Sequence, residues 1–141
     1  MPTSADPDVL VDTSTAVPLV VADHEDHATV SHALQGRILG LAGHAAFETY
    51  SVLTRLPAPL RRTPAATHRL LRANFPASRF LDDDATSLLL DRLAGLGIAG
   101  GAVYDALVGA AALHHGLTLA TRDDGAAATY RKLGVDTWTA K

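Results

Sequence analysis

The sequence predicts an α/β protein whose helices cover both faces of a central, mostly parallel sheet. Short apolar runs alternate along the chain with longer segments of helical periodicity, which is typical of successive strand–helix units. Hydrophobic residues make up 48% of the chain but aromatic residues only 5%, so we expect a core of Ala, Leu and Val. With 141 residues, the chain is long enough to bury one core and has the length of a single domain.

The expected strands are short, largely apolar runs bounded by polar residues, glycine or proline, as is typical of strands buried on both faces. In chain order they are Val9–Val11 and residues 37–42, 79–81, 117–120 and 135–139. At least one segment of helical period separates each strand from the next, which favours parallel pairing.

The expected helices have apolar residues at intervals of three and four. In chain order they cover residues 16–21, 24–35, 44–56, 64–74, 85–96, 103–115 and 126–133. Ser14 or Thr15 is the candidate N-cap of the first helix, and Asp124 is the candidate N-cap of the last. Pro57 and Pro59 end the third helix, because proline cannot continue a helix. The last three helices each stop at a glycine, namely Gly97, Gly116 and Gly134.

Charge and cysteine content narrow the class of protein. A formal net charge of −3 gives no overall reason to expect nucleic-acid binding. The absence of cysteine excludes disulfides and thiolate metal sites and is compatible with a reducing cytosol. The first apolar run is interrupted by Asp12 and is too short to span a bilayer. We therefore expect a cytoplasmic protein without membrane contact, in which residues 1–8 are a flexible lead-in and residues 9–141 form the domain.

Four acids are expected at one edge of the sheet. Asp12 ends the first strand and Asp123 follows the strand at 117–120, whereas Glu48 and Asp105 lie near the starts of helices. In a parallel sheet, the carboxyl ends of the strands and the starts of the following helices share one edge, so these carboxylates can face one pocket. Oxygen ligands without His or Cys suit Mg²⁺ or Mn²⁺. Such an ion lowers the pKa of a bound water and stabilises phosphoryl oxygens.

Each acid also has a purely structural interpretation. Asp12 and Asp123 could cap the helices that follow them, and Asp105 lies where a negative charge favours the helix dipole. Glu48 could be a solvated helix residue, although its neighbours are apolar. The acidic run at residues 82–84 precedes a helix and is expected to cap it rather than to reach the pocket.

Four ordered motifs resemble those of a known family. They read VDTSTAVPL, HAAFETYSVLTRLP, GGAVYDALVGAAALHHG and TLATRDDGAAATYRKLGV. Together they resemble the motifs of PIN-domain ribonucleases, specifically the VapC toxins of bacterial toxin–antitoxin pairs. The resemblance runs from about Val9 to the end of the chain.

The resemblance implies a PIN-like three-layer α/β/α sandwich and an endoribonuclease that depends on Mg²⁺ or Mn²⁺. It also implies a VapB-type antitoxin as partner, an RNA substrate such as a loop of tRNA or rRNA, and a homodimer. The family's catalytic and metal-binding acids fall on Asp12, Glu48, Asp105 and Asp123. Hydroxyls that brace the family's site fall on Thr13, Ser14 and Thr121. Asp124 beside Asp123 leaves open which of the two neighbours is the fourth acid.

A basic segment occupies residues 55–79. It contains no acid and half of the 12 Lys and Arg residues, all of them arginine. Arginine suits phosphate recognition and base stacking, and single-stranded RNA would fit such a segment better than a duplex. A solvated helical face, or a surface that docks an acidic partner, explains the segment equally well.

Two other functions compete with the ribonuclease. A phosphotransfer or receiver-type domain also gathers Asp at strand ends, but it is expected to need a lysine near the phosphate. The only lysines, Lys132 and Lys141, lie late in the chain and away from the acids. A catalytically silent PIN-like module that acts through a protein partner is the second alternative, and intact acids at all four motif positions argue against it.

Overall fold

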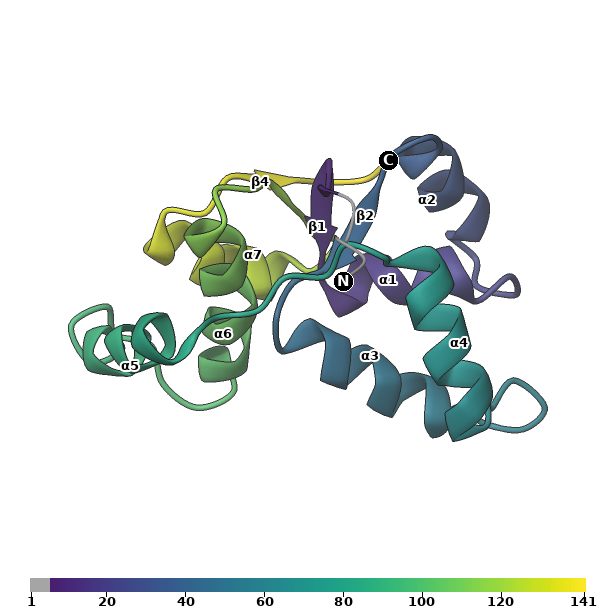
Figure 1. Ribbon diagram of the computed structural model, residues 1–141, viewed down its shortest axis with the longest axis horizontal. Helices are drawn as coiled ribbons and strands as arrows, with labels where there is room; N and C mark the ends of the chain where they lie inside the picture. The colour runs from purple at the N-terminus through teal and green to yellow at the C-terminus, as the bar shows by residue number, and fades with distance from the viewer. Residues whose placement is uncertain (1–5) are drawn as a thin grey trace.

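A four-stranded, fully parallel sheet lies at the centre of the protein (Figure 1). The computed structural model describes residues 6–141, so most of the predicted lead-in at residues 1–8 lies outside the described residues. The strands are β1 (Val9–Val11), β2 (Leu39–Leu41), β3 (Leu119–Ala120) and β4 (Thr137–Trp138). Their spatial order is β2-β1-β3-β4, so β1 pairs with β3 although more than a hundred residues separate them.

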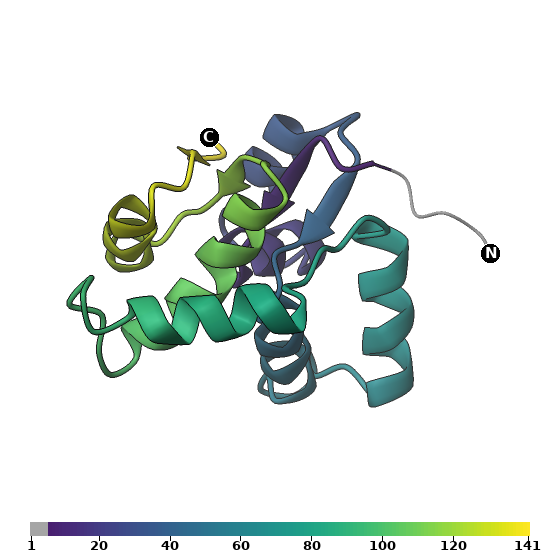
Figure 2. The same ribbon diagram turned by 60° about the vertical axis from the view of Figure 1, so that its left-hand side comes forward.

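Helices cover both faces of this sheet, as the sequence predicts. They are α1 (Thr13–Val20), α2 (His27–Leu34), α3 (Ala45–Thr54), α4 (Pro64–Asn74), α5 (Asp83–Arg92), α6 (Ala102–His114) and α7 (Asp124–Leu133). Helices α1 to α4 lie on one side of the sheet and α5 to α7 on the other, and α3 and α4 run beside each other in both views (Figures 1 and 2). None of these helices is long and apolar enough to cross a membrane.

Strand β1 divides the core into two layers. Leu10 is fully buried against the cluster that contains residues of α6 and α7, including Tyr130. Val9 and Val11 point the other way, into the cluster formed with α1, α2 and α3. This alternation of side chains across one strand confirms the predicted three-layer arrangement.

The predicted strand at residues 79–81 is wrong. The chain there runs beside β2 and forms only an isolated parallel bridge between Ala42 and Arg79. The Ser78 hydroxyl, and not a backbone carbonyl, accepts the hydrogen bond from the Leu41 backbone N–H at 2.9 Å. The segment also crosses so close to β2 that a Cβ at Gly40 would lie 2.1 Å from the Ala77 carbonyl oxygen. Backbone N–H groups of Ala77 and Arg79 donate to the carbonyl oxygens of Leu39 and Leu41, and the Ser78 hydroxyl interrupts the ladder between them.

Two helix starts also differ from the prediction. Asp12, and not Ser14 or Thr15, is the N-cap of α1, because its carboxylate accepts a hydrogen bond from the Thr15 backbone N–H. Similarly, Asp123 caps α7, and Asp124 is the first residue of that helix. Both corrections have the same origin: each strand passes directly into a helix, so the acid at the strand end becomes the cap.

Candidate active site

The four predicted acids line one small cavity at the carboxyl edge of the sheet. Its volume is about 50 Å³, and its wall consists of Asp12, Thr13, Ser14, Glu48, Asp105, Val108, Asp123, Ala126 and Tyr130. Asp12 and Asp123 follow the adjacent strands β1 and β3, whereas Glu48 lies on α3 and Asp105 in the first turn of α6. The roles assigned to these acids remain predictions, but the structure places the four side chains around one space.

Asp12 is the deepest of the four acids, with only 4% of its surface exposed. One carboxylate oxygen accepts hydrogen bonds from the Ser14 hydroxyl at 2.6 Å and from the Thr15 backbone N–H at 3.3 Å. The other oxygen accepts from the Tyr130 hydroxyl at 2.9 Å. Burial raises the pKa of Asp12, and these hydrogen bonds oppose the rise because they stabilise the ionised form.

Asp123 is held by the start of its own helix. Its Oδ1 accepts from the backbone N–H groups of Gly125 at 2.9 Å and Ala126 at 3.2 Å. Its own N–H donates to the Thr121 hydroxyl at 3.2 Å. The side chain thus has a fixed direction before any ligand arrives.

Glu48 and Asp105 are held much less firmly. Within residues 6–141, neither carboxylate accepts a hydrogen bond, and the only ion-pair neighbour of Glu48 is His44, whose Nε2 lies 3.9 Å from Oε1. Burial raises the pKa of Glu48 and the charges of Asp105 and Asp12 add to the rise, while the charge of His44 opposes it. Burial also raises the pKa of Asp105, with further contributions from the charges of Asp123 and Asp12. The acids therefore lie close enough to repel one another.

The three predicted bracing hydroxyls each contact an element that carries an acid. Thr13 Oγ1 lies 3.0 Å from Thr49 Oγ1 of α3, the helix that bears Glu48. Ser14 donates to Asp12 and also accepts from the Arg122 backbone N–H at 2.7 Å, which ties α1 to the end of β3. Thr121 accepts from the Asp123 N–H, as described above.

Tyr130 belongs to the site although the sequence analysis assigned it only to a helix. It is 1% exposed and packs into a notch at Gly109, where a Cβ would lie 2.7 Å from its Cδ1 atom. Burial and the nearby charge of Asp12 raise the pKa of its hydroxyl, which therefore stays a proton donor. A tyrosine on the buried face of a helix needs a polar partner, and that requirement is the signal by which the sequence could have revealed it.

Comparison with known proteins identifies the family. Residues 9–132 match the PIN domain. The chain belongs to the PIN-domain family. It is 50% identical to Ribonuclease VapC27 of Mycobacterium tuberculosis over 129 residues, which cover 92% of this chain and 94% of that relative. It is 47% identical to Ribonuclease VapC40 of the same organism over 127 residues, which cover 89% of this chain and 93% of that relative. Within the PIN domains, the chain therefore groups with the VapC ribonucleases, which confirms the resemblance seen in the motifs.

Solved structures share the fold. FitAcB from Neisseria gonorrhoeae superposes with a TM-score of 0.67 at 19% identity, over 94% of this chain and 97% of that one. VapC20 of Mycobacterium tuberculosis, described as a sarcin–ricin loop cleaving toxin, gives a TM-score of 0.66 at 17% identity, over 85% of this chain and 93% of that one. The predicted PIN-like α/β fold is thereby confirmed.

The donor set of this PIN domain fits a hard divalent cation. All four acids offer carboxylate oxygens, which Mg²⁺ and Mn²⁺ prefer. Within residues 6–141, no Lys or Arg forms an ion pair with any of them. Over the same residues, no group of three or more His, Cys, Asp and Glu side chains is arranged so that it could hold a metal ion.

The remaining polar candidates lie outside the cavity. Asp124 is exposed in the first turn of α7, and Asp82 caps α5 by accepting from the Ala85 N–H at 2.8 Å. In the basic segment, Arg61 donates to the Leu56 carbonyl oxygen at 2.8 Å, whereas Arg69 and Arg72 are exposed on α4. The structure thus favours the two arginines of α4 as the part of this segment that is open to a partner.

Proposed function

We propose that this chain is the toxin of a toxin–antitoxin pair and hydrolyses RNA phosphodiester bonds with the help of Mg²⁺ or Mn²⁺. One observation carries the proposal: four carboxylates from four separate elements line one cavity, and among residues 6–141 no Lys or Arg forms an ion pair with any of them. The identity of 50% to a VapC ribonuclease over nearly the whole chain supports the same activity. Residues 9–141 are the functional unit in this proposal.

Asp12, Glu48, Asp105 and Asp123 would hold the ion. When bound, the ion supplies Lewis acidity and lowers the pKa of a water molecule. The chain itself supplies the fixed directions of Asp12 and Asp123, through the hydrogen bonds of Ser14, Tyr130 and the start of α7. A bound cation would also stabilise the fold, because it would offset the repulsion among the four carboxylates.

The test is RNA cleavage by the purified chain, freed of any partner. We expect cleavage in Mg²⁺ or Mn²⁺, none in EDTA, and none by Asp12→Asn. Asp82→Asn is the matched control, because Asp82 caps a helix outside the cavity. Cleavage that continues in EDTA at an unchanged rate would contradict the metal mechanism. Mapping of 5′ ends in cellular RNA after brief induction, with and without Asp12→Asn, identifies the target.

The alternative function is a catalytically silent PIN-like module that acts through a protein partner. The observation in its favour is that the acid side chains of residues 6–141 are not arranged as a ready metal site. Titration with Mn²⁺ separates the two functions. The ribonuclease requires a melting temperature that rises with Mn²⁺ in the parent and much less in Asp12→Asn, whereas the silent module requires no response in either.

An antitoxin of the VapB type is the proposed protein partner. Solved relatives of the same fold include the complexes FitAB and VapBC2, each bound to DNA. We expect co-expression of a small neighbouring protein to suppress both growth arrest and RNA cleavage. Co-expression that leaves both intact would argue against this partner.

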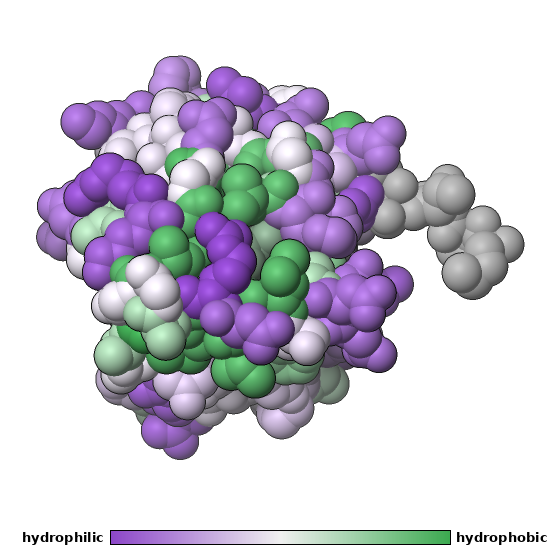
Figure 3. Space-filling view, turned by 90° about the vertical axis from the view of Figure 1, so that its left-hand side faces the viewer, coloured by the Kyte–Doolittle hydropathy of each residue, from purple (hydrophilic) through white to green (hydrophobic). Residues whose placement is uncertain are grey.

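A homodimer is also part of the proposal, and α5 offers the surface for it. Leu88 and Leu90 are 59% and 71% exposed, and hollows of about 120 Å³ and 540 Å³ flank the helix. Figure 3 shows hydrophobic residues gathered on the face that includes α5. Exposed apolar patches of this kind mark interaction sites. Light scattering should report a dimer for the parent and a monomer for Leu90→Asp.

The exposed arginines of α4 are proposed to contact RNA phosphates. Replacing Arg69 and Arg72 with Ala should weaken RNA binding and flatten its dependence on salt, by about 0.7 in slope for each contact to a single strand. An unchanged slope would assign both arginines to a solvated surface.

A further inference from the structure

Four aromatic side chains form a continuous row beside the acid cavity. The rings of Tyr104 and His44 are stacked, with their centroids 5.3 Å apart and their planes inclined by 25°. His44 lies 6.5 Å from Phe47, and Phe47 lies 6.3 Å from Phe80 in an edge-to-face arrangement. We call these four residues the aromatic row. It joins α6, α3 and the segment before α5.

The row is open to solvent to an unusual degree. Phe47 is 66% exposed, Tyr104 54% and Phe80 47%. Aromatic residues make up only 5% of the chain, so three of its few large rings are exposed on one part of its surface. Exposed apolar surface gathered in this way marks a binding site more often than it serves the fold.

One end of the row reaches the acids. Tyr104 directly precedes Asp105 on α6, and His44 Nε2 lies 3.9 Å from Glu48 Oε1. A molecule that is held on these rings therefore lies next to the two acids that accept no hydrogen bond among the described residues.

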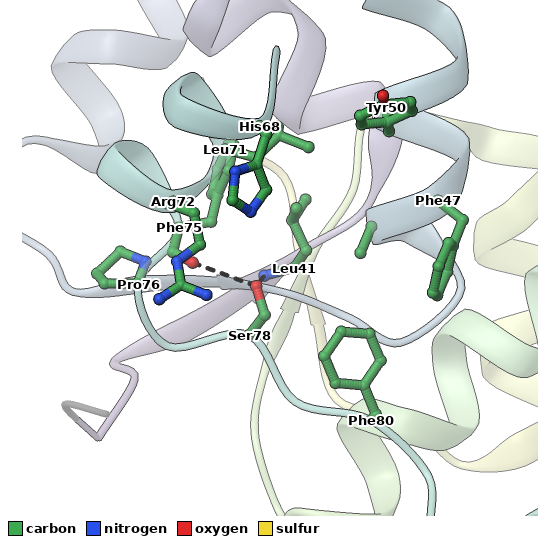
Figure 4. A pocket seen from close by; sticks show the side chains of 11 residues that line it. Leu41, Phe47, Tyr50, His68, Leu71, Arg72, Phe75, Pro76, Ser78 and Phe80 are labelled. Carbon is green, nitrogen blue, oxygen red and sulfur yellow. Dashed lines mark hydrogen bonds between the residues drawn. The ribbon is translucent and has the colours of Figure 1, made fainter. Parts of the chain in front are cut away.

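The other end of the row opens into two hollows. The smaller one, of about 170 Å³, lies between His44, Phe47 and Phe80 over a floor that includes Gly43 and Leu107. Phe47 and Phe80 also border a larger cavity of about 570 Å³, between α3 and α4. In Figure 4 these two rings lie on one side of the larger cavity.

A guanidinium and an imidazole lie across this larger cavity from the two rings. Arg72 and His68 come from α4 and are exposed at the opposite side of the cavity (Figure 4). Between the acids and α4, the surface thus presents first the aromatic row and then the guanidinium of Arg72. Such an order matches a single nucleic-acid strand, whose bases stack on aromatic side chains while cations contact its phosphates.

We propose that the aromatic row binds the bases of single-stranded RNA next to the bond that is cut. The inference rests on the proposed ribonuclease function and adds to it a base-stacking site that extends from the acids toward α4. A second copy of the chain is the competing occupant. The exposed leucines of α5 are an aliphatic surface suited to that contact, whereas the aromatic row combines flat rings with the nearby guanidinium of Arg72. Stacking also predicts little preference between bases, because every base has a π-face.

The test measures binding separately from cleavage. A labelled single-stranded RNA oligonucleotide is titrated with protein in EDTA, and fluorescence anisotropy gives Kd. We expect the double variant Phe47→Leu with Phe80→Leu to bind about tenfold more weakly than the parent, because leucine keeps an apolar side chain but removes the ring. An oligonucleotide with abasic central positions should bind the parent about tenfold more weakly and should bind the variant without further loss.

Two further variants serve as a control and as a second test of the row. Ile38→Ala removes an exposed apolar side chain that lies outside both the row and α5, and it should leave Kd unchanged. Tyr104→Leu tests the end of the row beside the acids and replaces the double variant should that variant fail to fold. Light scattering and antitoxin binding are measured on every protein.

Each outcome decides the inference. Unchanged Kd in the ring variants, or equal binding of abasic and normal RNA, overturns it. Loss of dimerisation or of antitoxin binding at unchanged Kd assigns the row to a protein partner and also overturns it. Ring-dependent binding without cleavage in Mn²⁺ supports the stacking site and contradicts the proposed function. Cleavage in Mn²⁺ without ring-dependent binding supports the proposed function and overturns the stacking site.

Discussion

Two halves of the acid cavity differ in how their carboxylates are held. Asp12 and Asp123 follow adjacent parallel strands and accept hydrogen bonds from helix N–H groups, so each is a helix cap as well as a candidate ligand. Glu48 and Asp105 lie on helices and accept no hydrogen bond within the described residues. Removing a held acid should therefore damage the fold, while removing an open acid should relieve it.

In the proposed metal site, the two pairs of carboxylates would differ in how far they must move to bind an ion. Held carboxylates need little reorganisation, whereas open ones can turn toward a charge when it arrives.

The largest effect is expected for Asp12→Ala. The change removes the N-cap of α1, which costs about 0.5–2 kcal/mol, and leaves the buried Tyr130 hydroxyl unpaired, which costs about 1–3 kcal/mol. We expect the free energy of unfolding to fall by about 2–4 kcal/mol in urea denaturation. Asp82→Ala removes a cap whose carboxylate is mostly exposed and should cost only about 1 kcal/mol. Equal losses in the two variants would mean that Asp12 is a cap and nothing more.

A smaller loss of stability is expected for Tyr130→Phe, which removes the hydrogen bond from the Tyr130 hydroxyl to Asp12. Hydrogen bonds to charged groups contribute about 1.5–3 kcal/mol, so the free energy of unfolding should fall by about that amount. Because the Tyr130 hydroxyl lowers the pKa of Asp12, that pKa should rise further in the variant, as NMR titration would reveal. Tyr104→Phe removes an exposed hydroxyl and should change neither quantity. A Tyr130→Phe protein as stable as the parent would show that this hydrogen bond does not matter.

The smallest effect, of opposite sign, is expected for Asp105→Asn in EDTA. The raised pKa of Asp105 favours its protonated form in the fold, so its relative stabilisation is present below the ordinary aspartate pKa of 3.8 and is lost as pH rises through the folded pKa. At pH 7 the Asn variant should be more stable than the parent, by less than about 1 kcal/mol because water screens the charge of the partly exposed Asp105. The difference should vanish at acid pH. Thermal melts across this pH range measure it, with the exposed Asp91→Asn as control.

Metal should reverse the order of these two proteins. With saturating Mn²⁺ the parent gains binding energy that Asp105→Asn lacks, so its melting temperature should equal or exceed that of the variant. A variant that is less stable than the parent in EDTA, together with a parent that does not respond to Mn²⁺, would make Asp105 a helix-start residue without a role in the cavity.

The sequence by itself predicted the layered architecture and the positions of the four acids. Strand ends and helix starts are local features, and a parallel sheet brings them to one edge whatever the order of its strands. Helix α4 illustrates how far local signals reach, because Thr63 caps it and Pro64 opens it, and its bounds agree with the prediction at both ends. The strand expected at residues 79–81 is reduced to a bridge at Arg79, because the Ser78 side chain takes the Leu41 N–H that a regular strand would bind through its backbone.

Only the tertiary structure decided which acids are held and which are open. The pairing of β1 with β3 places Asp12 within reach of α7, and the notch at Gly109 lets Tyr130 approach it. The aromatic row likewise joins rings from three distant segments. Contacts of this kind join residues far apart in the chain, and the period of apolar residues along a segment carries no information about which distant partner a buried side chain will meet.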